Sequence, residues 1–535
     1  MLTPNIMRSA QLILLCTFVA LTTAACGGSD SKLSHAAADV DPTDPTDPTD
    51  PTDPTDPTDP TDPTDPTDPT DPTDPTDPTD PTDPTDPTDP VTISKCRAAE
   101  FPSALWTACE LKNYGIALGS IVGNLVKTDF VLKYTLQSTA NLTEFTWRTL
   151  TDIHWDSVTN LCGTMAGPCV GDPLRYPINN PWYDNVGTVT PVNFYDKEGA
   201  RLSGRVWAPK NPPVGKTYPA VIILNGSVQA PETLYWWAAQ LLVQNGYLVM
   251  TFDPRGQGRS DTRTPDFKFG SNLNPVVFRR NLIDAIDFFY STPTALYPHN
   301  LSGAAGPIGD SNRAKTTSYN PIYQLLDRDR LGIAGHSLGA TGVSVVQGES
   351  DWQGTMHTSN PVKAMVAWDN LMLSDNLDGV PVVPRIPSMG QSGDYFLLPA
   401  PHLTPPSDNK NAGFDLWQEN SVDSYQINIR GATHFDWSLI YPLPSSNWEP
   451  GKIIAADGSD NGAGWANPVA QYYTLAWFDR YLKLPGEQGY ADADSRLLND
   501  RIFRDRLSWY HPSKRAFKNR NDKLQSCENI ALGCQ

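Results

Sequence analysis

The apolar and polar positions between residues 186 and 482 alternate between short strand-like runs and longer helical ones. Two runs with period-two alternation, 186–195 and 200–208, flank a polar turn at 196–199 and predict a β-hairpin. Beyond it, apolar runs typical of buried strands alternate with stretches of helical spacing. The strand-like runs are 219–224, 247–252, 331–334, 362–368, 386–389 and 424–429, and the helical ones are 234–243, 276–290, 414–419 and 470–482. This order predicts an α/β fold whose mainly parallel sheet has helices on both faces.

The segments on either side of this regular region show a weaker pattern. Residues 91–180 form an N-terminal extension in which 114–136 and 142–153 have helical spacing. Such helices either cover a site at the edge of the sheet or brace the sheet. We expect one main domain at 181–485, followed by a C-terminal tail at 486–535.

Residues 41–90 repeat the triplet Asp-Pro-Thr without interruption. The repeat has 17 aspartates and no cation, and it offers no apolar side chain for a core. Proline at every third position favours extended polyproline II, and at about 3.1 Å per residue the repeat spans on the order of 150 Å. We therefore expect 26–90 to be a disordered stalk.

The first 25 residues have the features of an export signal. Arg8 precedes an apolar stretch at 12–21, which is too short for a membrane span, and small residues follow it. Residues 23–26, Thr-Ala-Ala-Cys, resemble a bacterial lipobox, and this resemblance implies that Cys26 is the lipidated first residue of the mature chain. We expect an exported lipoprotein of the cell envelope or surface, with plain secretion as the alternative.

The net charge of the chain becomes small once the stalk is set aside. The formal charge is −20, and the 17 stalk aspartates account for all but about −3 of it. A nucleic-acid partner would require a basic face, which a nearly neutral domain does not provide.

Six cysteines remain after Cys16 in the signal and Cys26 at the expected anchor are set aside. In an exported chain this number favours disulfides, and no pair has the spacing of a zinc site. Close spacing suggests three local bonds, which are Cys96 with Cys109, Cys162 with Cys169, and Cys527 with Cys534.

Gly335, His336, Ser337, Leu338 and Gly339 stand between the strand-like run 331–334 and a run of small residues. This is the pattern of a nucleophilic serine on a sharp turn from strand to helix, where glycines on either side admit a strained backbone. We expect Ser337 to be a catalytic nucleophile.

A serine hydroxyl needs a base that removes its proton as it attacks. His434 is the best candidate because it follows the strand-like run 424–429 through a short loop, which places it at the carboxyl edge of the sheet. The other histidines outside the serine turn lack a strand leading into them.

The base in turn needs a carboxylate, which hydrolases of this layout place between the serine and the histidine in the chain. Two aspartates end strands there, Asp369 and Asp394. We favour Asp394, which opens a flexible loop, and keep Asp369 as the alternative acid.

The oxyanion of a tetrahedral intermediate requires amide donors. One is expected to be the amide of Leu338, directly after the nucleophile. The other is expected from the loop after Leu224, with Ser227 favoured and Val228 next.

Seven stretches together resemble the secreted α/β-hydrolases of the esterase, lipase and cutinase type, which include polyester hydrolases. They are PAVIILNGS at 219–227, FDPRGQGRSD at 252–261, GHSLGA at 335–340, VKAMVAWDN at 362–370, IPSMGQSGDY at 386–395, GATHF at 431–435 and YYTLAWFDRYL at 472–482. The resemblance implies an α/β-hydrolase fold over 181–485 and no cofactor or metal. It does not reach the first 180 residues, the insertion at 291–327 or the tail.

These patterns lead to one functional hypothesis with two alternatives. We expect a serine-dependent carboxylic-ester hydrolase that acts through an acyl-enzyme on lipid-like or polymeric esters outside the cytoplasm, as a monomeric catalytic domain. A peptidase or acyltransferase on the same fold is the second reading, and an inactive, stalked surface-binding protein is the third.

Overall fold

The structure is a computed structural model, and it describes the chain from residue 90 onward with several gaps. The described ranges are 90–122, 128–155, 169–177, 180–227, 231–270, 274–303, 316–372, 379–396, 400–438 and 465–534. The expected signal, the anchor at Cys26 and the Asp-Pro-Thr stalk lie outside them, as do residues 304–315 of the 291–327 insertion. The contacts within the chain place residues Pro81–Gln535 in one compact unit.

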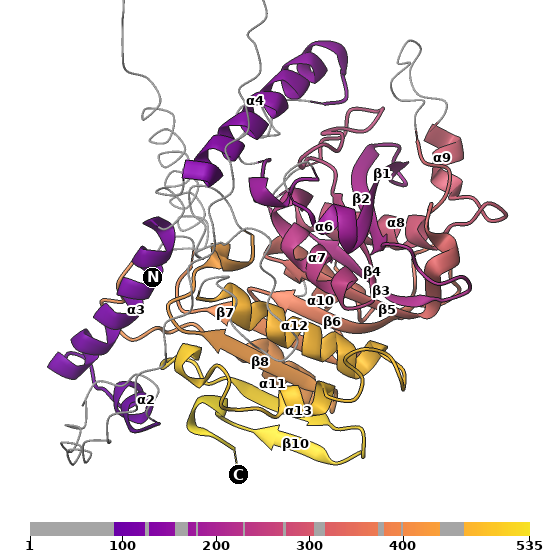
Figure 1. The fold of residues 1–535 in the computed structure, drawn as a ribbon. Helices are drawn as coiled ribbons and strands as arrows, with labels where there is room; N and C mark the ends of the chain where they lie inside the picture. The colour runs from indigo at the N-terminus through magenta and orange to yellow at the C-terminus, as the bar shows by residue number, and fades with distance from the viewer. Residues whose placement is uncertain are drawn as a thin grey trace, which may run out of the picture. The chain divides into compact units, whose positions relative to one another are not determined.

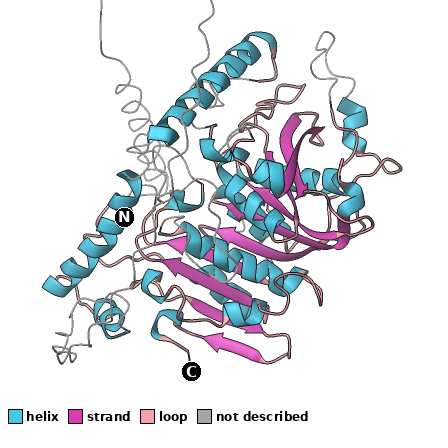
Figure 2. Cartoon of the chain, in the orientation of Figure 1, coloured by secondary structure: helices cyan, strands magenta, loops and turns pink. Residues whose placement is uncertain are grey.

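A single ten-stranded sheet forms the centre of this unit, in the order β1-β2-β4-β3-β5-β6-β7-β8-β9-β10 (Figures 1 and 2). The six central strands from β4 to β8 are parallel, and the edge strands β1, β2, β9 and β10 join antiparallel. The strands are β1 Gly187–Tyr195, β2 Arg201–Pro209, β3 Tyr218–Leu224, β4 Leu248–Asp253, β5 Leu326–His336, β6 Val362–Trp368, β7 Ser388–Gly393, β8 Ser424–Ile429, β9 Lys514–Lys518 and β10 Leu524–Cys527. The expected mainly parallel α/β sheet is confirmed.

Helices cover both faces of the sheet, as its alternating side chains require. Along β3, Val221 and Ile223 belong to one apolar cluster with helices α7 and α12, whereas Ile222 and Leu224 belong to another with α8 and α10. The main helices are α7 Trp236–Gln244, α8 Pro275–Tyr290, α9 Pro298–Gly303, α10 Leu338–Val346, α11 Ala412–Glu419, α12 Asn467–Leu482 and α13 Ala493–Leu497.

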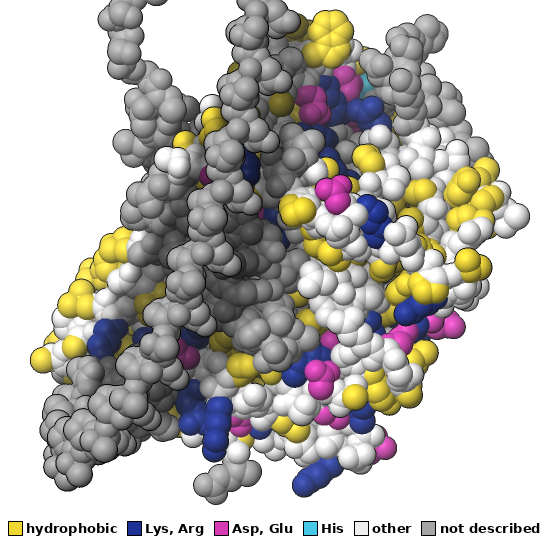
Figure 3. Space-filling model, viewed as in Figure 1, with side chains coloured by type: hydrophobic (Ala, Val, Ile, Leu, Met, Phe, Trp, Pro, Cys, Tyr) yellow, Lys and Arg dark blue, Asp and Glu magenta, His cyan; other side chains and the backbone are white. Residues whose placement is uncertain are grey.

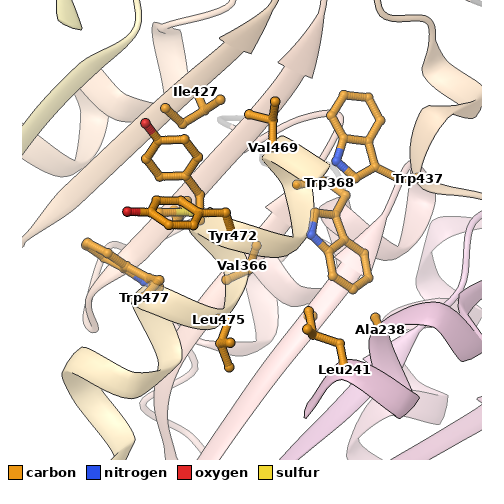
Figure 4. Close-up of a cluster of buried hydrophobic side chains, with 14 of the residues drawn as sticks. Ala238, Leu241, Val366, Trp368, Ile427, Trp437, Val469, Tyr472, Leu475 and Trp477 are labelled. Atoms are coloured by element: carbon orange, nitrogen blue, oxygen red, sulfur yellow. The ribbon is translucent and has the colours of Figure 1, made fainter. Parts of the chain in front are cut away.

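The first apolar cluster is rich in aromatic side chains. Trp368 of β6 lies between α7 and α12, close to Trp437 and Val469 (Figure 4). Its indole nitrogen donates to Thr474 on α12 at 3.1 Å, so this large side chain is both buried and satisfied. Packing at Trp368 therefore fixes the end of β6, which is also the strand that leads into Asp369.

The N-terminal extension folds into helices whose limits differ from the expected ones. The structure has α2 Pro90–Arg97, α3 Ala104–Val122, α4 Thr128–Thr151 and the short α6 Trp182–Asn185. The expected helix at 114–136 is wrong, because the structure ends one helix at Val122 and begins the next at Thr128. The expected helix at 142–153 is the second half of α4. No helix in the described ranges combines the length and the apolar character needed to cross a membrane.

The C-terminal tail adds β9 and β10 to the edge of the same sheet, next to β8. Two of the expected disulfides are present, Cys96 with Cys109 and Cys527 with Cys534. Cys169 is also disulfide-bonded, and its expected partner Cys162 lies outside the described residues.

Candidate active site

Ser337 lies on the sharp turn between β5 and α10. Its backbone has φ 58° and ψ −120°, a conformation that is strained for a residue with a side chain. The turn is possible only because glycines stand two positions away on either side. A Cβ on Gly335 would lie 2.3 Å from the carbonyl oxygen of Gly339, and one on Gly339 would lie 2.4 Å from the carbonyl oxygen of Leu224. The expected serine turn is thus present in the backbone.

His434 follows β8 and begins a short 3-10 turn, η4 His434–Trp437. The turn is held by Asp436, whose carboxylate accepts from the amide and the hydroxyl of Thr433. The amide of His434 donates to the carbonyl of Phe396 at 3.0 Å, and the two rings are in contact with their centroids 5.2 Å apart. The histidine therefore stands at the carboxyl edge of the sheet on a loop fixed from both sides.

Asp369 is the carboxylate that contacts His434. It follows β6, the strand next to β5, and its Oδ2 is hydrogen-bonded to Nδ1 of His434. Burial acts to raise the pKa of Asp369, but the hydrogen bond and the charge of His434 outweigh it and leave the pKa below its ordinary value. Asp369 is therefore ionised at neutral pH and can orient the imidazole and stabilise its protonated form.

Asp394, which the sequence favoured as the acid, has other partners. Its carboxylate accepts from the side chain of Asn113 at 3.2 Å, from the amide of Gly431 at 3.1 Å and from the hydroxyl of Ser508. Burial raises its pKa to about 6, despite these hydrogen bonds. The choice between the two acids is thus corrected to Asp369. Both residues end parallel strands, and only the direction of each side chain, which depends on packing distant in sequence, separates them.

The residue before the nucleophile takes part in a buried hydrogen-bond chain. The amide of Gly226 donates to the Tyr235 hydroxyl at 2.9 Å, and that hydroxyl is 2.8 Å from Nδ1 of His336. Nε2 of His336 is 2.9 Å from the carbonyl oxygen of His434. A neutral imidazole, accepting at Nδ1 and donating at Nε2, satisfies every member of this chain.

The environment of His336 agrees with that assignment. Burial and, secondarily, the neighbouring His434 lower the pKa of His336 to about 3. His336 and His434 lie against each other, with ring centroids 4.5 Å apart. Because Ser337 directly follows His336, this contact brings the serine turn and the histidine loop together. The sequence placed His336 in the turn but gave no sign that Tyr235 is part of the same chain.

Both amides expected as donors to an oxyanion, those of Leu338 and Ser227, lie in described residues. Leu338 begins α10, so its amide is among those that a helix leaves without an internal acceptor. In the loop after β3, the Gly226 amide is already engaged by Tyr235, and no described residue accepts from the Ser227 amide. Leu338 and Ser227 thus remain the candidates, while Val228 lies outside the described residues.

The site is bordered by segments that the sequence did not connect to it. Glu110 of α3 accepts from the hydroxyls of Tyr395 and Tyr510 and from the amide of His402. A hollow of about 450 Å³ lies beside Phe396 and is lined by Tyr395 and residues 400–408. The N-terminal extension therefore contacts the loop that carries one wall of the site. Within the described ranges, no group of three or more potential metal ligands comes together.

Comparisons with known proteins give only a distant likeness. No model of a known protein family matches the chain, and no curated protein matches it. One solved structure that it resembles is a "putative dipeptidyl aminopeptidase IV" from Bacteroides ovatus, with a TM-score of 0.34 and 12% sequence identity. The match covers 57% of this chain and 37% of that chain, so this chain corresponds to less than half of that protein's length.

Proposed function

We propose that the protein is a serine hydrolase of carboxylic esters that works through an acyl-enzyme. The observation that supports this most strongly is the hydrogen bond between His434 and Asp369. The ring of His434 also lies against that of His336, the residue that precedes Ser337. An ionised carboxylate on Nδ1 fixes the tautomer in which Nε2 is free to accept a proton.

The chemistry follows from these positions. The Oγ of Ser337 attacks the ester carbonyl carbon while its proton passes to Nε2 of His434. The amides of Leu338 and Ser227 stabilise the oxyanion. The bond to the leaving alcohol then breaks, and His434 returns the proton to the alcohol oxygen. A water molecule repeats the sequence, which releases the acid and restores the Ser337 hydroxyl.

The choice of esters rests on the resemblance of the seven motifs to the esterase, lipase and cutinase group. Peptidases and acyltransferases use the same three side chains, and the solved structure of the preceding comparison is described as a peptidase. The substrate class must therefore be tested directly.

A substrate panel at one pH distinguishes these activities. It contains nitrophenyl esters of graded acyl length, a polyester film and a dipeptide anilide, with and without an added alcohol as acyl acceptor. We expect ester turnover by the natural chain and none by Ser337→Ala. Cleavage of the anilide without ester turnover would instead favour the peptidase, and transfer to the alcohol in preference to water the acyltransferase.

The same proposal includes export and a lipid anchor on Cys26. The support is the N-terminal signal pattern and its lipobox-like end. Metabolic labelling with a fatty acid tests it, because incorporation should be lost in Cys26→Ser and retained in Cys16→Ser.

A further inference from the structure

Helix α4 packs against the rest of the protein through a mixed side, which buries Phe130 and Phe145 and also makes polar contacts. Glu144 pairs with Arg259 at 3.0 Å, and the same guanidinium donates to Asn141 at 3.1 Å. Arg148 pairs with the buried Asp261 at 3.1 Å. A helix on the surface of a soluble domain ordinarily buries most of its apolar side chains, whereas α4 buries two aromatic ones and leaves several large ones exposed.

The opposite side of α4 is apolar and exposed. Leu132, Leu136, Trp147 and Leu150 have exposed fractions of 60%, 63%, 67% and 75%. At 3.6 residues per turn these four positions fall within about 60° of one another around the helix. The charged side chains of α4 that reach the surface are Asp129, the partly exposed Lys133 that pairs with it at 3.0 Å, and Glu144, which pairs with Arg259. This side of the helix is therefore a nearly uncharged apolar stripe.

Helix α3 also buries a mixed side, which includes Trp106, Cys109 and Ala117. Glu110 and Asn113 are buried and bond to Tyr395 and Asp394 of the domain. Its exposed apolar side chains are Leu105, Leu111 and Leu118. Of the twenty large apolar side chains exposed in the described part of the chain, ten lie between Phe101 and Ile153, which is far more than an even distribution would place there. Hydrophobic side chains gather over α3 at the left edge of Figure 3.

The polar contacts of both helices are made with loops next to the candidate site. Helix α3 contacts the segment that ends in Phe396, which packs on His434. Helix α4 contacts Arg259 through Glu144. Two residues before Arg259, the side chain of Gln257 donates to the carbonyl of Gly226 in the expected oxyanion loop. The exposed apolar sides of α3 and α4, here called the apolar helix face, thus belong to the surroundings of the site.

The way the chain enters the folded part favours one kind of partner. Residues 1–89, which include the expected lipid anchor, precede α2, and the Cys96–Cys109 disulfide ties α2 to α3. A membrane that holds the N-terminus is therefore joined to the folded part at these helices. A lipid surface also suits a face with leucines, a tryptophan and few charges.

We propose that the apolar helix face binds the interfacial region of an uncharged phospholipid bilayer, with Trp147 and Leu150 entering the acyl boundary. Exposed patches of this kind mark contacts with apolar partners. The cations beside this one are few, Lys112 on α3 and Lys133, which pairs with Asp129, so we expect the apolar side chains to carry the binding and a zwitterionic lipid to suffice. The binding requires neither hydrolysis nor the identity of the substrate.

Quenching of tryptophan fluorescence by brominated phosphatidylcholine tests contact with the acyl chains. The full chain carrying Ser337→Ala is mixed with vesicles of plain or brominated phosphatidylcholine, so that hydrolysis plays no part and an anchor alone gives no signal at Trp147. We expect quenching in the parent and the loss of most of it in Trp147→Phe and in the double variant Leu136→Asp, Leu150→Asp. The matched controls Trp352→Phe and Leu484→Asp, Leu524→Asp should be quenched like the parent.

Three results overturn the proposal. One is equal quenching in the parent and Trp147→Phe, and another is binding that requires anionic lipid and weakens with salt. The third is a parent that forms dimers in sedimentation, with the Leu136→Asp, Leu150→Asp variant monomeric, because a second copy would then cover the face. The same variants are also made in the natural chain, which retains Ser337. Their turnover of a soluble ester tests the proposed function separately from lipid binding.

Discussion

Nδ1 of His434 is hydrogen-bonded to Oδ2 of Asp369, although 65 residues separate them in the chain. Asp369 stands beside the turn that carries Ser337 because it directly follows β6, which lies next to β5 in the sheet. The amide of Ser337 donates to the carbonyl of Trp368 at 3.1 Å, which ties the two strand ends together. The paired side chains of His434 and Asp369 thus lie at the edge of the sheet that also carries the Ser337 turn.

Replacing Asp369 by Asn should nearly abolish turnover. The amide cannot hold His434 in the required tautomer or stabilise its protonated form, and such a change lowers kcat by about 10³ to 10⁴-fold in enzymes with this arrangement. Steady-state kinetics on a short nitrophenyl ester measure the effect, and KM should change little.

Asp394→Asn is the matched control for that experiment, because both residues are buried carboxylates at strand ends. We expect kcat to stay within about tenfold of the natural chain, since Asp394 contacts Asn113, Gly431 and Ser508 and not His434. If Asp394→Asn removed turnover and Asp369→Asn did not, the assignment of the acid would be reversed.

The buried Asp394 should also make stability depend on pH. Its pKa is about 6 in the folded state against 3.8 ordinarily, so folding favours the protonated form. The stability that it contributes is fully present below pH 3.8 and is lost as the pH rises through 6, by ~3 kcal/mol in all. Urea unfolding at several pH values should show a shallower decline in Asp394→Asn than in the natural chain. Equal slopes in the two proteins would contradict the raised pKa.

Gly339→Ala should damage both stability and turnover. The added Cβ would lie 2.4 Å from the carbonyl oxygen of Leu224 and 2.5 Å from that of Asn225, and backbone atoms cannot move away as a side chain can. We expect a loss of about 1–3 kcal/mol in the free energy of unfolding, measured by urea denaturation.

Gly115→Ala provides the comparison for this substitution. Nothing lies within 4 Å of a Cβ at Gly115, which is exposed within α3. The change should stabilise the protein by about 0.5–1 kcal/mol, because alanine favours a helix over glycine. A Gly339→Ala variant that is as stable as the natural chain would mean that the turn at Ser337 tolerates a side chain.

Tyr235→Phe should lower kcat as well as stability. The change leaves the Gly226 amide and Nδ1 of His336 without their shared partner, which costs about 1–3 kcal/mol in a buried site. Tyr290→Phe removes a comparable bond to the carbonyl of Arg328, on the strand end away from the site, and should leave kcat unchanged. Equal kcat values in the two variants would show that the buried chain does not position His434.

The sequence predicted the parts of the fold that depend on local pattern. Strands β3, β4, β6 and β8 were expected within a residue or two, because fully buried strands are short, continuous apolar runs. The turn at Ser337 was also predictable, since only glycines fit beside it. The limits of α3 and α4 were not, because their apolar residues lie on the exposed side as well as the buried side, which blurs the periodicity.

The site was predictable as far as chain order determines it. Ser337 and His434 each follow a strand that pattern alone identifies. The choice between Asp369 and Asp394 depends on which strand lies beside β5 and on the direction of each side chain, and neither is encoded nearby in sequence. The contacts of Glu110 and Asn113 with loops almost 300 residues away have no local signal at all.

The most direct test of the account is to locate the reactive hydroxyl. The natural chain, Ser337→Ala and His434→Ala are each treated with a fluorophosphonate, digested and analysed by mass spectrometry. We predict one covalent adduct on the peptide that contains Ser337, none in Ser337→Ala, and strongly slowed labelling in His434→Ala. An unmodified Ser337 in the natural chain, or an adduct on another residue that persists in Ser337→Ala, would contradict it.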